Sequence, residues 1–115
     1  MTNKINNLLT ELSKKSITFK DVIEFIEGHY QHHATAFKNG DVYNDAMQNQ
    51  GSAKVFAFGQ LHHLTKDETL QLFAEHYQSV MEHPDGVDHQ NIRQFMAHGW
   101  EGIAFEQAES LKAKA

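Results

Sequence analysis

Apolar side chains in the first thirty residues recur every three or four positions, which is the spacing of one helix face. The first stripe consists of Ile5, Leu8, Leu9 and Leu12. The second consists of Phe19, Val22, Ile23, Ile26 and Tyr30. Thr18 and Asp21 have the spacing of a capping box, in which a side chain at each end of the first turn bonds the backbone at the other. The pattern predicts two amphipathic helices, over residues 3–15 and from residue 19 to about residue 30.

The pattern then changes to alternating apolar and polar residues around Asn39-Gly40. This dipeptide between two alternating segments is the strongest short-range indication of a hairpin with a two-residue turn. We predict strands over 35–38 and 41–44, with both turn residues at positive φ and Phe37 opposite Val42. Because an isolated hairpin is marginally stable in water, it must lie on helices or gain another strand.

The central segment predicts two further helices. Ser52 can begin the first, which runs to about His63 and is apolar on most sides, as expected for a helix in the middle of the core. Thr65 and Glu68 form a complete capping box for the second. Its apolar stripe continues without interruption to Met81, so we predict one helix over this whole length.

The last third predicts a helix followed by a strand. Asp88 can cap the fifth helix, whose apolar stripe consists of Ile92, Phe95, Met96 and Gly99. Residues 103–106 alternate again and predict a closing strand that pairs with the hairpin. Residues 107–115 are expected to be a frayed polar tail. The fold class is therefore α+β, about five helices with a small antiparallel sheet, in a single compact domain over residues 1–106.

Composition narrows the classes of function. The 115 residues include no cysteine, so a thiolate nucleophile and a cysteine-type zinc site are excluded. The net charge of −5 argues against nucleic acid or an anionic membrane as partners. Nine histidines are unusual, and protonation of all of them would bring the charge to +4. His29 and His33 are four residues apart but have no third ligand at recognisable spacing, so we expect neither a metal nor a cofactor.

Asp88, His89, Asn91 and Arg93 form the most interesting polar segment. His89 borders the apolar stripe of the fifth helix, and Arg93 lies four residues later on a similar face. Together these side chains could bind an anion or perform acid–base chemistry. The structural alternative is a hydrogen-bond network that fastens the helix start. An open cleft at His89 that contains Asn91 or Arg93 would favour the enzyme, whereas burial would favour the network.

Trp100 lies between two glycines and is the single tryptophan of the chain. We expect it to anchor the core where the last helix meets the closing strand. An exposed recognition residue is the alternative, and Trp100 therefore joins the candidate ligand-binding residues.

Several strings of residues, taken in order, carry a resemblance to a known family. They are Thr35-Ala36-Phe37-Lys38-Asn39-Gly40, Gly51-Ser52, Phe56-Ala57-Phe58, Asp88-His89-Gln90-Asn91-Ile92-Arg93 and Gly99-Trp100. From about Phe19 to Phe105 the chain resembles the HopJ type III effector family. Relatives tend to carry Thr-Pro where this chain has His33-Ala34, and often cysteine at the positions of Ala53 and Leu72. Any cysteine-based mechanism of the family is therefore excluded here.

The resemblance implies a bacterial protein whose family is named after type III secretion, and it brings no catalytic residues with it. We therefore expect a domain that binds a protein or a small ligand. A hydrolase is the alternative, with His89 as acid or base, Asp88 orienting it and Arg93 holding an anion. Residues 3–15 form a helix rather than a mobile serine-rich signal. The expected location is the cytoplasm, with secretion into a host if the effector name applies.

Overall fold

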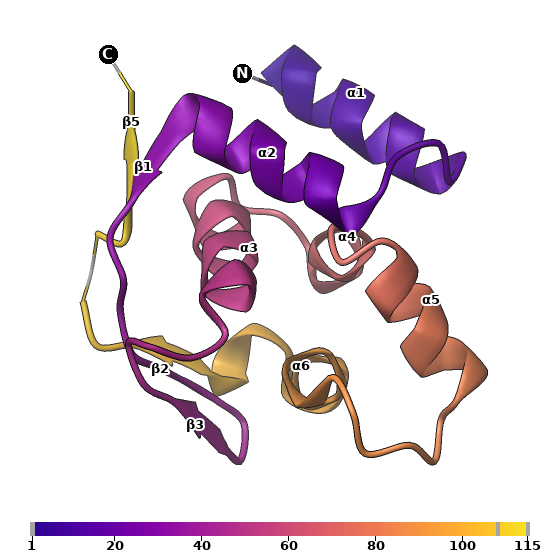
Figure 1. The fold of residues 1–115 in the computed structure, drawn as a ribbon, viewed down its shortest axis with the longest axis vertical. Helices are drawn as coiled ribbons and strands as arrows, with labels where there is room; N and C mark the ends of the chain where they lie inside the picture. The colour runs from indigo at the N-terminus through magenta and orange to yellow at the C-terminus, as the bar shows by residue number, and fades with distance from the viewer. Residues whose placement is uncertain (1, 108, 115) are drawn as a thin grey trace.

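The computed structural model describes residues 2–107 and 109–114, and its described part is an α+β fold (Figure 1). These residues contain six α-helices, whereas the sequence predicts about five. The helices are α1 (Thr2–Ser13), α2 (Phe19–His29), α3 (Gln50–Leu61), α4 (Lys66–Gln71), α5 (Glu75–Glu82) and α6 (Gln90–His98), followed by the 3-10 helix η1 (Gly99–Gly102). The strands are β1 (Tyr30–His32), β2 (Phe37–Asn39), β3 (Val42–Asn44), β4 (Ile103–Phe105) and β5 (Leu111–Ala113). None of these helices is long and apolar enough to cross a membrane.

Helix α3 lies at the centre of the molecule, as its apolar composition predicts (Figure 1). Helix α2 packs on one side of it, and strand β5 and helix α4 also contact it. Its middle carries six buried residues in succession apart from one lysine: Ala53, Val55, Phe56, Ala57, Phe58 and Gly59. The core therefore forms around this helix.

The hairpin forms, but its register differs from the predicted one. Asn39 pairs with Val42 and Phe37 with Asn44, so the turn residues are Gly40 and Asp41. Of the two residues expected at positive φ, only Gly40 has it, at 58°. The reason is a tertiary contact. Asn39 is fully buried and donates its amide to helix α6, which holds it in the strand instead of the turn.

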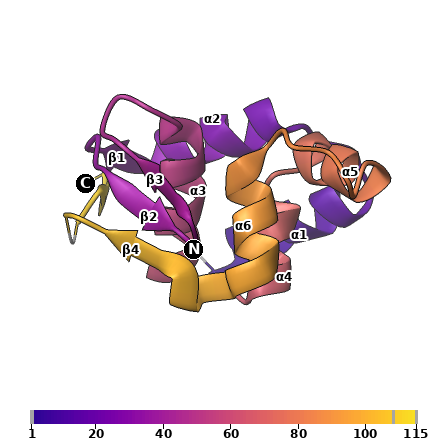
Figure 2. The ribbon, with the colours of Figure 1, turned by 90° about the horizontal axis from the view of Figure 1, so that it is seen from below.

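Strand β4 closes the sheet as predicted, pairing antiparallel with β2 in the order β3-β2-β4. Seen from below, α6 lies beside this sheet (Figure 2). The frayed tail expected over residues 107–115 is wrong for residues 111–113, which form β5 and pair with β1. Leu111 and Ser110 are buried there, so the end of the chain completes the core; residues 108 and 115 lie outside the described part.

Local capping signals are confirmed at two helix starts and fail at two others. The capping boxes of Thr18 with Asp21 and of Thr65 with Glu68 are both complete. Ser52, by contrast, is not an N-cap, because α3 already begins after Asn49. Residue Asp88 does not cap α6 either, since the N-cap is His89.

The helix predicted from Thr65 to Met81 is interrupted. Helix α4 ends at Gln71, and α5 begins after Ala74, which has φ 52° and ψ −123°, a conformation that favours glycine. Leu72 and Phe73 in this turn are both buried. Bending the chain here lets α4 pack on α1 while α5 packs on α6, and burial of the two side chains outweighs a continuous helix.

Candidate functional site

A cavity of about 440 Å³ lies where the N-termini of α3 and α6 approach each other. It is also bordered by α5, by the start of α2 and by strand β3. The lining residues are Phe19, Val42, Asn49, Gly51, Ser52, Phe73, His76, His89, Gln90, Asn91 and Ile92. Its size is that of an ordinary small-molecule site. Of the predicted candidates, the cavity brings together His89 and Asn91.

Both helices that start at this cavity have unusual N-caps. Asn49 before α3 and His89 before α6 adopt the left-handed conformation, each with φ 51°. A typical N-cap is extended and bonds the first turn with its side chain. Neither residue makes such a bond. The N–H groups of two helix starts, each with its positive dipole end, therefore border the cavity without a capping side chain.

Two histidines meet at the same cavity. The imidazole rings of His76 on α5 and His89 have centroids 5.0 Å apart and are tilted by 36°. His76 also packs against the edge of Phe19, with centroids 4.9 Å apart. Protonated imidazoles attract anions, and neutral ones both donate and accept hydrogen bonds. The pair thus adds polar groups to a wall formed by helix starts.

A network of asparagines fixes the relative position of the two helix starts. Asn91 accepts from the amides of Asn39 at 3.0 Å and of Asn44 at 3.1 Å, and donates to Asn44 at 3.1 Å. Asn49 donates to the same oxygen of Asn44 at 2.6 Å. Asn39, Asn44 and Asn91 are buried, with exposed fractions of 0%, 0% and 7%. The Asn91 side chain is therefore engaged with Asn39 and Asn44, and these bonds position α6.

Asp88 and Arg93 are bonded to each other. The Arg93 guanidinium donates to the Asp88 carboxylate at 2.7 Å, to the Asp88 carbonyl at 2.6 Å and to the Pro84 carbonyl at 3.3 Å. The hydrogen bond from Arg93 lowers the pKa of the Asp88 carboxyl. Because this carboxylate faces Arg93, it does not cap α6. The network predicted as the alternative to a site thus exists for these two residues, and Arg93 is outside the lining of the cavity.

Trp100 is partly buried and packs against the core. Its indole N–H donates to the Leu64 carbonyl at 3.0 Å. Its ring lies edge-on to Phe95 and Phe56, with centroids 4.9 and 6.4 Å away. It is not among the residues that line the cavity at His89.

Several residues of the site are not found by sequence reasoning. His76 lies in a predicted helix, but nothing in its spacing indicates that it meets His89. Asn49 and Ser52 lie at a helix start that was placed three residues too late. The one available signal is the recurrence of asparagine at 39, 44 and 49, flanking the predicted hairpin and the following loop. In the part of the chain that the structure describes, no group of three or more histidine and acidic side chains could hold a metal ion.

Two other histidines are partly buried and affect the pH dependence of stability. Burial lowers the pKa of both His32 and His62. His32 Nε2 lies 3.0 Å from the side-chain oxygen of Gln50. His62 packs on Phe58 and contacts the Tyr30 hydroxyl. Below the ordinary histidine pKa of about 6.5 the unfolded chain binds these protons more readily than the folded one.

We therefore expect the free energy of unfolding to fall as the pH is lowered from 8 through 6.5 towards 5. Urea denaturation at several pH values measures this fall. The double variant His32→Gln, His62→Gln should show a flatter dependence. An unchanged slope in that variant would contradict the assignment to these two residues.

Fold and cavity together define a class of protein: a small α+β domain with a ligand-sized cavity between two helix starts. The chain matches the model of the HopJ type III effector protein family over residues 5–110 and therefore belongs to that family. It is similar to a protein whose solved structure is described as "Crystal structure of unknown function protein VPA0580". The two share 45% sequence identity at a TM-score of 0.86, over 95% of this chain and 92% of that chain. No curated protein matches the sequence.

Proposed function

We propose that the protein binds a small anionic ligand in the cavity between α3 and α6. The observation that carries this proposal is the convergence of two helix starts without side-chain caps and the pair His76–His89 on one cavity. Helix N-termini favour anions through their free N–H groups and their dipole. No acidic side chain is among the lining residues; the nearest carboxylate that faces the histidine pair is that of Asp88, 4.0 Å from His89 Nε2 and bonded to Arg93. A carboxylate or a phosphate group has the matching chemistry.

Binding is better supported than hydrolysis. Asn91 lines the cavity beside His89, as expected of a hydrolase site. Asp88 and Arg93, however, do not take the positions that the hydrolase would need. The Asp88 carboxylate is 4.0 Å from His89 Nε2, which is longer than a hydrogen bond that would orient a base. Arg93 is bonded to Asp88 and to carbonyl oxygens instead of facing the cavity. We therefore assign His89 to ligand recognition.

Sulfate is a suitable probe because it is a small dianion of the kind that helix N-termini bind. We expect a titration followed by amide NMR to shift the N–H signals of residues 50–52 and 90–92. The double variant His76→Gln, His89→Gln should lose about tenfold in affinity, equivalent to ~1.4 kcal/mol. A variant of exposed His33, His33→Gln, serves as the control and should bind as the wild type does.

Ser52→Asp provides a second test that preserves the fold. Ser52 lies in the first turn of α3, where a carboxylate complements the helix dipole, so the variant should fold normally. Its negative charge in the cavity should abolish sulfate binding, whereas Ser52→Asn should retain it. Sulfate binding that survives Ser52→Asp, or amide shifts confined to other surfaces, would refute the proposal.

A further inference from the structure

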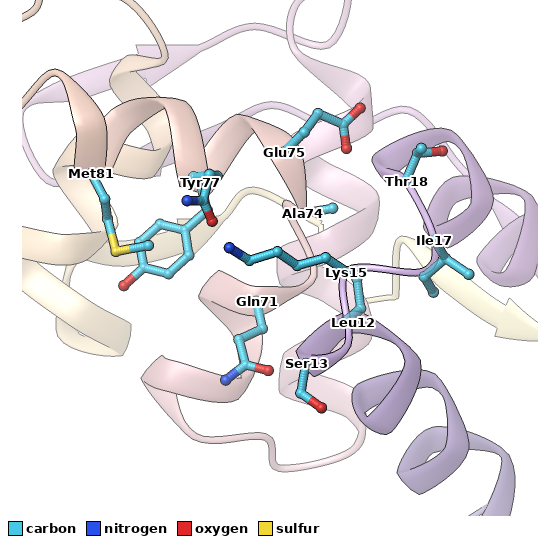
Figure 3. Close-up of a pocket in the computed structure, with 11 residues that line it drawn as sticks. Leu12, Ser13, Lys15, Ile17, Thr18, Gln71, Ala74, Glu75, Tyr77 and Met81 are labelled. Carbon is cyan, nitrogen blue, oxygen red and sulfur yellow. The ribbon is translucent and has the colours of Figure 1, made fainter.

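A second cavity, of about 390 Å³, lies between the end of α1 and helix α5 (Figure 3). Leu12 and Ile17 line it from the N-terminal segment, and Tyr77 and Met81 from α5. These four side chains form a largely apolar wall. Met81 is about half exposed, at 49%, so apolar surface is open to solvent here. The cavity is large enough for a small organic molecule.

The polar groups of this cavity leave one positive charge without a partner. Glu75 also lines the cavity and keeps its negative charge, but its carboxylate is turned away from Lys15 towards the start of α2, where it accepts the Phe19 backbone N–H at 2.7 Å (Figure 3). Lys15 extends its side chain across the cavity towards Tyr77 (Figure 3). Among the described residues its ammonium group makes no hydrogen bond and no ion pair. An apolar cavity with one free cation favours a ligand of complementary charge.

The backbone of Lys15 forms a tight turn at the end of α1. It follows α1 in the left-handed conformation, with φ 57°. Its N–H donates to the Leu12 carbonyl at 3.0 Å, and the Ser16 N–H donates to the Glu11 carbonyl at 3.1 Å. These bonds satisfy two carbonyl groups at the end of α1. On the opposite wall, Ala74 is held at φ 52°, so both sides of the cavity are fixed by tightly turned backbone.

We propose that this cavity binds an amphipathic carboxylic acid, with an unbranched hydrocarbon body against Leu12, Ile17, Tyr77 and Met81 and its carboxylate on Lys15. The proposal is independent of the anion site between α3 and α6, because the two cavities share no lining residue. An acid with both features gains from burial of its apolar body and from a charge-assisted hydrogen bond to the ammonium group.

Decanoate, kept below its micellar concentration, is the probe, and decanol is its uncharged analogue. We expect calorimetry to show saturable binding of decanoate at least about tenfold tighter than that of decanol. Amide NMR should place the shifts at residues 12–18 and 71–81. Lys15→Met should remove the preference for decanoate over decanol, while Lys14→Met, which changes the neighbouring lysine outside the cavity, should keep it.

Three outcomes would overturn the proposal: no saturable decanoate binding, equal affinities for acid and alcohol in the wild type, or an unchanged preference in Lys15→Met. The double variant His76→Gln, His89→Gln should bind decanoate as the wild type does. Loss of decanoate binding in that variant would place the acid in the other cavity and would equally contradict the assignment to Lys15.

Discussion

Replacing Phe56 by alanine is expected to lower the free energy of unfolding by about 3–5 kcal/mol, the usual cost of removing a fully buried phenylalanine. Phe56 is 0% exposed and lies in the central helix α3. Its ring lies 5.0 Å from that of Phe95 and 5.4 Å from that of Phe73, measured between centroids. The substitution therefore leaves a void where α3, α6 and the turn after α4 meet. Urea denaturation followed by circular dichroism measures the loss.

Phe25→Ala is the matched control. Phe25 lies on α2, is only partly buried and touches Phe58 at a centroid distance of 6.0 Å. Because less apolar area returns to water and the surroundings can relax into the space, the loss should be less than half of that for Phe56→Ala. Equal losses in the two variants would contradict the placement of Phe56 at the centre of the core.

Elements that depend on local signals could be predicted from the sequence. Helix α1, with its stripe from Ile5 to Leu12, and the capping boxes at Thr18 and Thr65 are determined by residues within one or two turns. The alternation at Ile103 to Phe105 likewise gave strand β4 and its pairing with the hairpin. At each of these positions the local preference of the sequence agrees with the fold of the whole chain.

Elements whose form depends on distant residues could not be predicted. Asn39-Gly40 has the composition of a turn, but the bond from Asn39 to Asn91, fifty-two positions away, places Asn39 in the strand. Leu111 to Ala113 has no alternation long enough to indicate a strand, and it becomes one because β1 offers a free edge. The left-handed residue Ala74 carries no composition signal at all, since alanine is otherwise the best helix former.

Only part of the candidate site could be predicted, because it too depends on contacts between distant residues. The segment from Asp88 to Arg93 is rich in polar side chains, so it attracted both a functional and a structural interpretation. The structure divides it: Asp88 and Arg93 bond each other, whereas His89 faces a cavity. The partner of His89 is His76 on another helix, and no spacing along a sequence shows that two such residues meet.

Asn44→Ala is expected to lower the free energy of unfolding by about 2–3 kcal/mol, although it removes only one small polar side chain. Its carbonyl oxygen accepts from Asn91 and Asn49, and its amide donates to Asn91. Without it, the Asn91 amide, on a residue that is only 7% exposed, loses its acceptor. An unsatisfied buried donor costs about 1–3 kcal/mol, and the space left behind adds to this.

The same variant connects the network to the proposed anion site. Asn44 bonds both Asn49, the N-cap of α3, and Asn91 in the first turn of α6. Without the Asn44 side chain, the two helix starts should move more freely relative to each other. We therefore expect sulfate affinity to fall together with stability. Asn49→Gly is the comparison for stability alone, because it removes one hydrogen bond to Asn44 from an exposed residue and glycine accepts the left-handed conformation. This variant should lose less than about 0.5 kcal/mol. If Asn44→Ala and Asn49→Gly cost the same, the buried amides of Asn39, Asn44 and Asn91 do not hold the helix starts together.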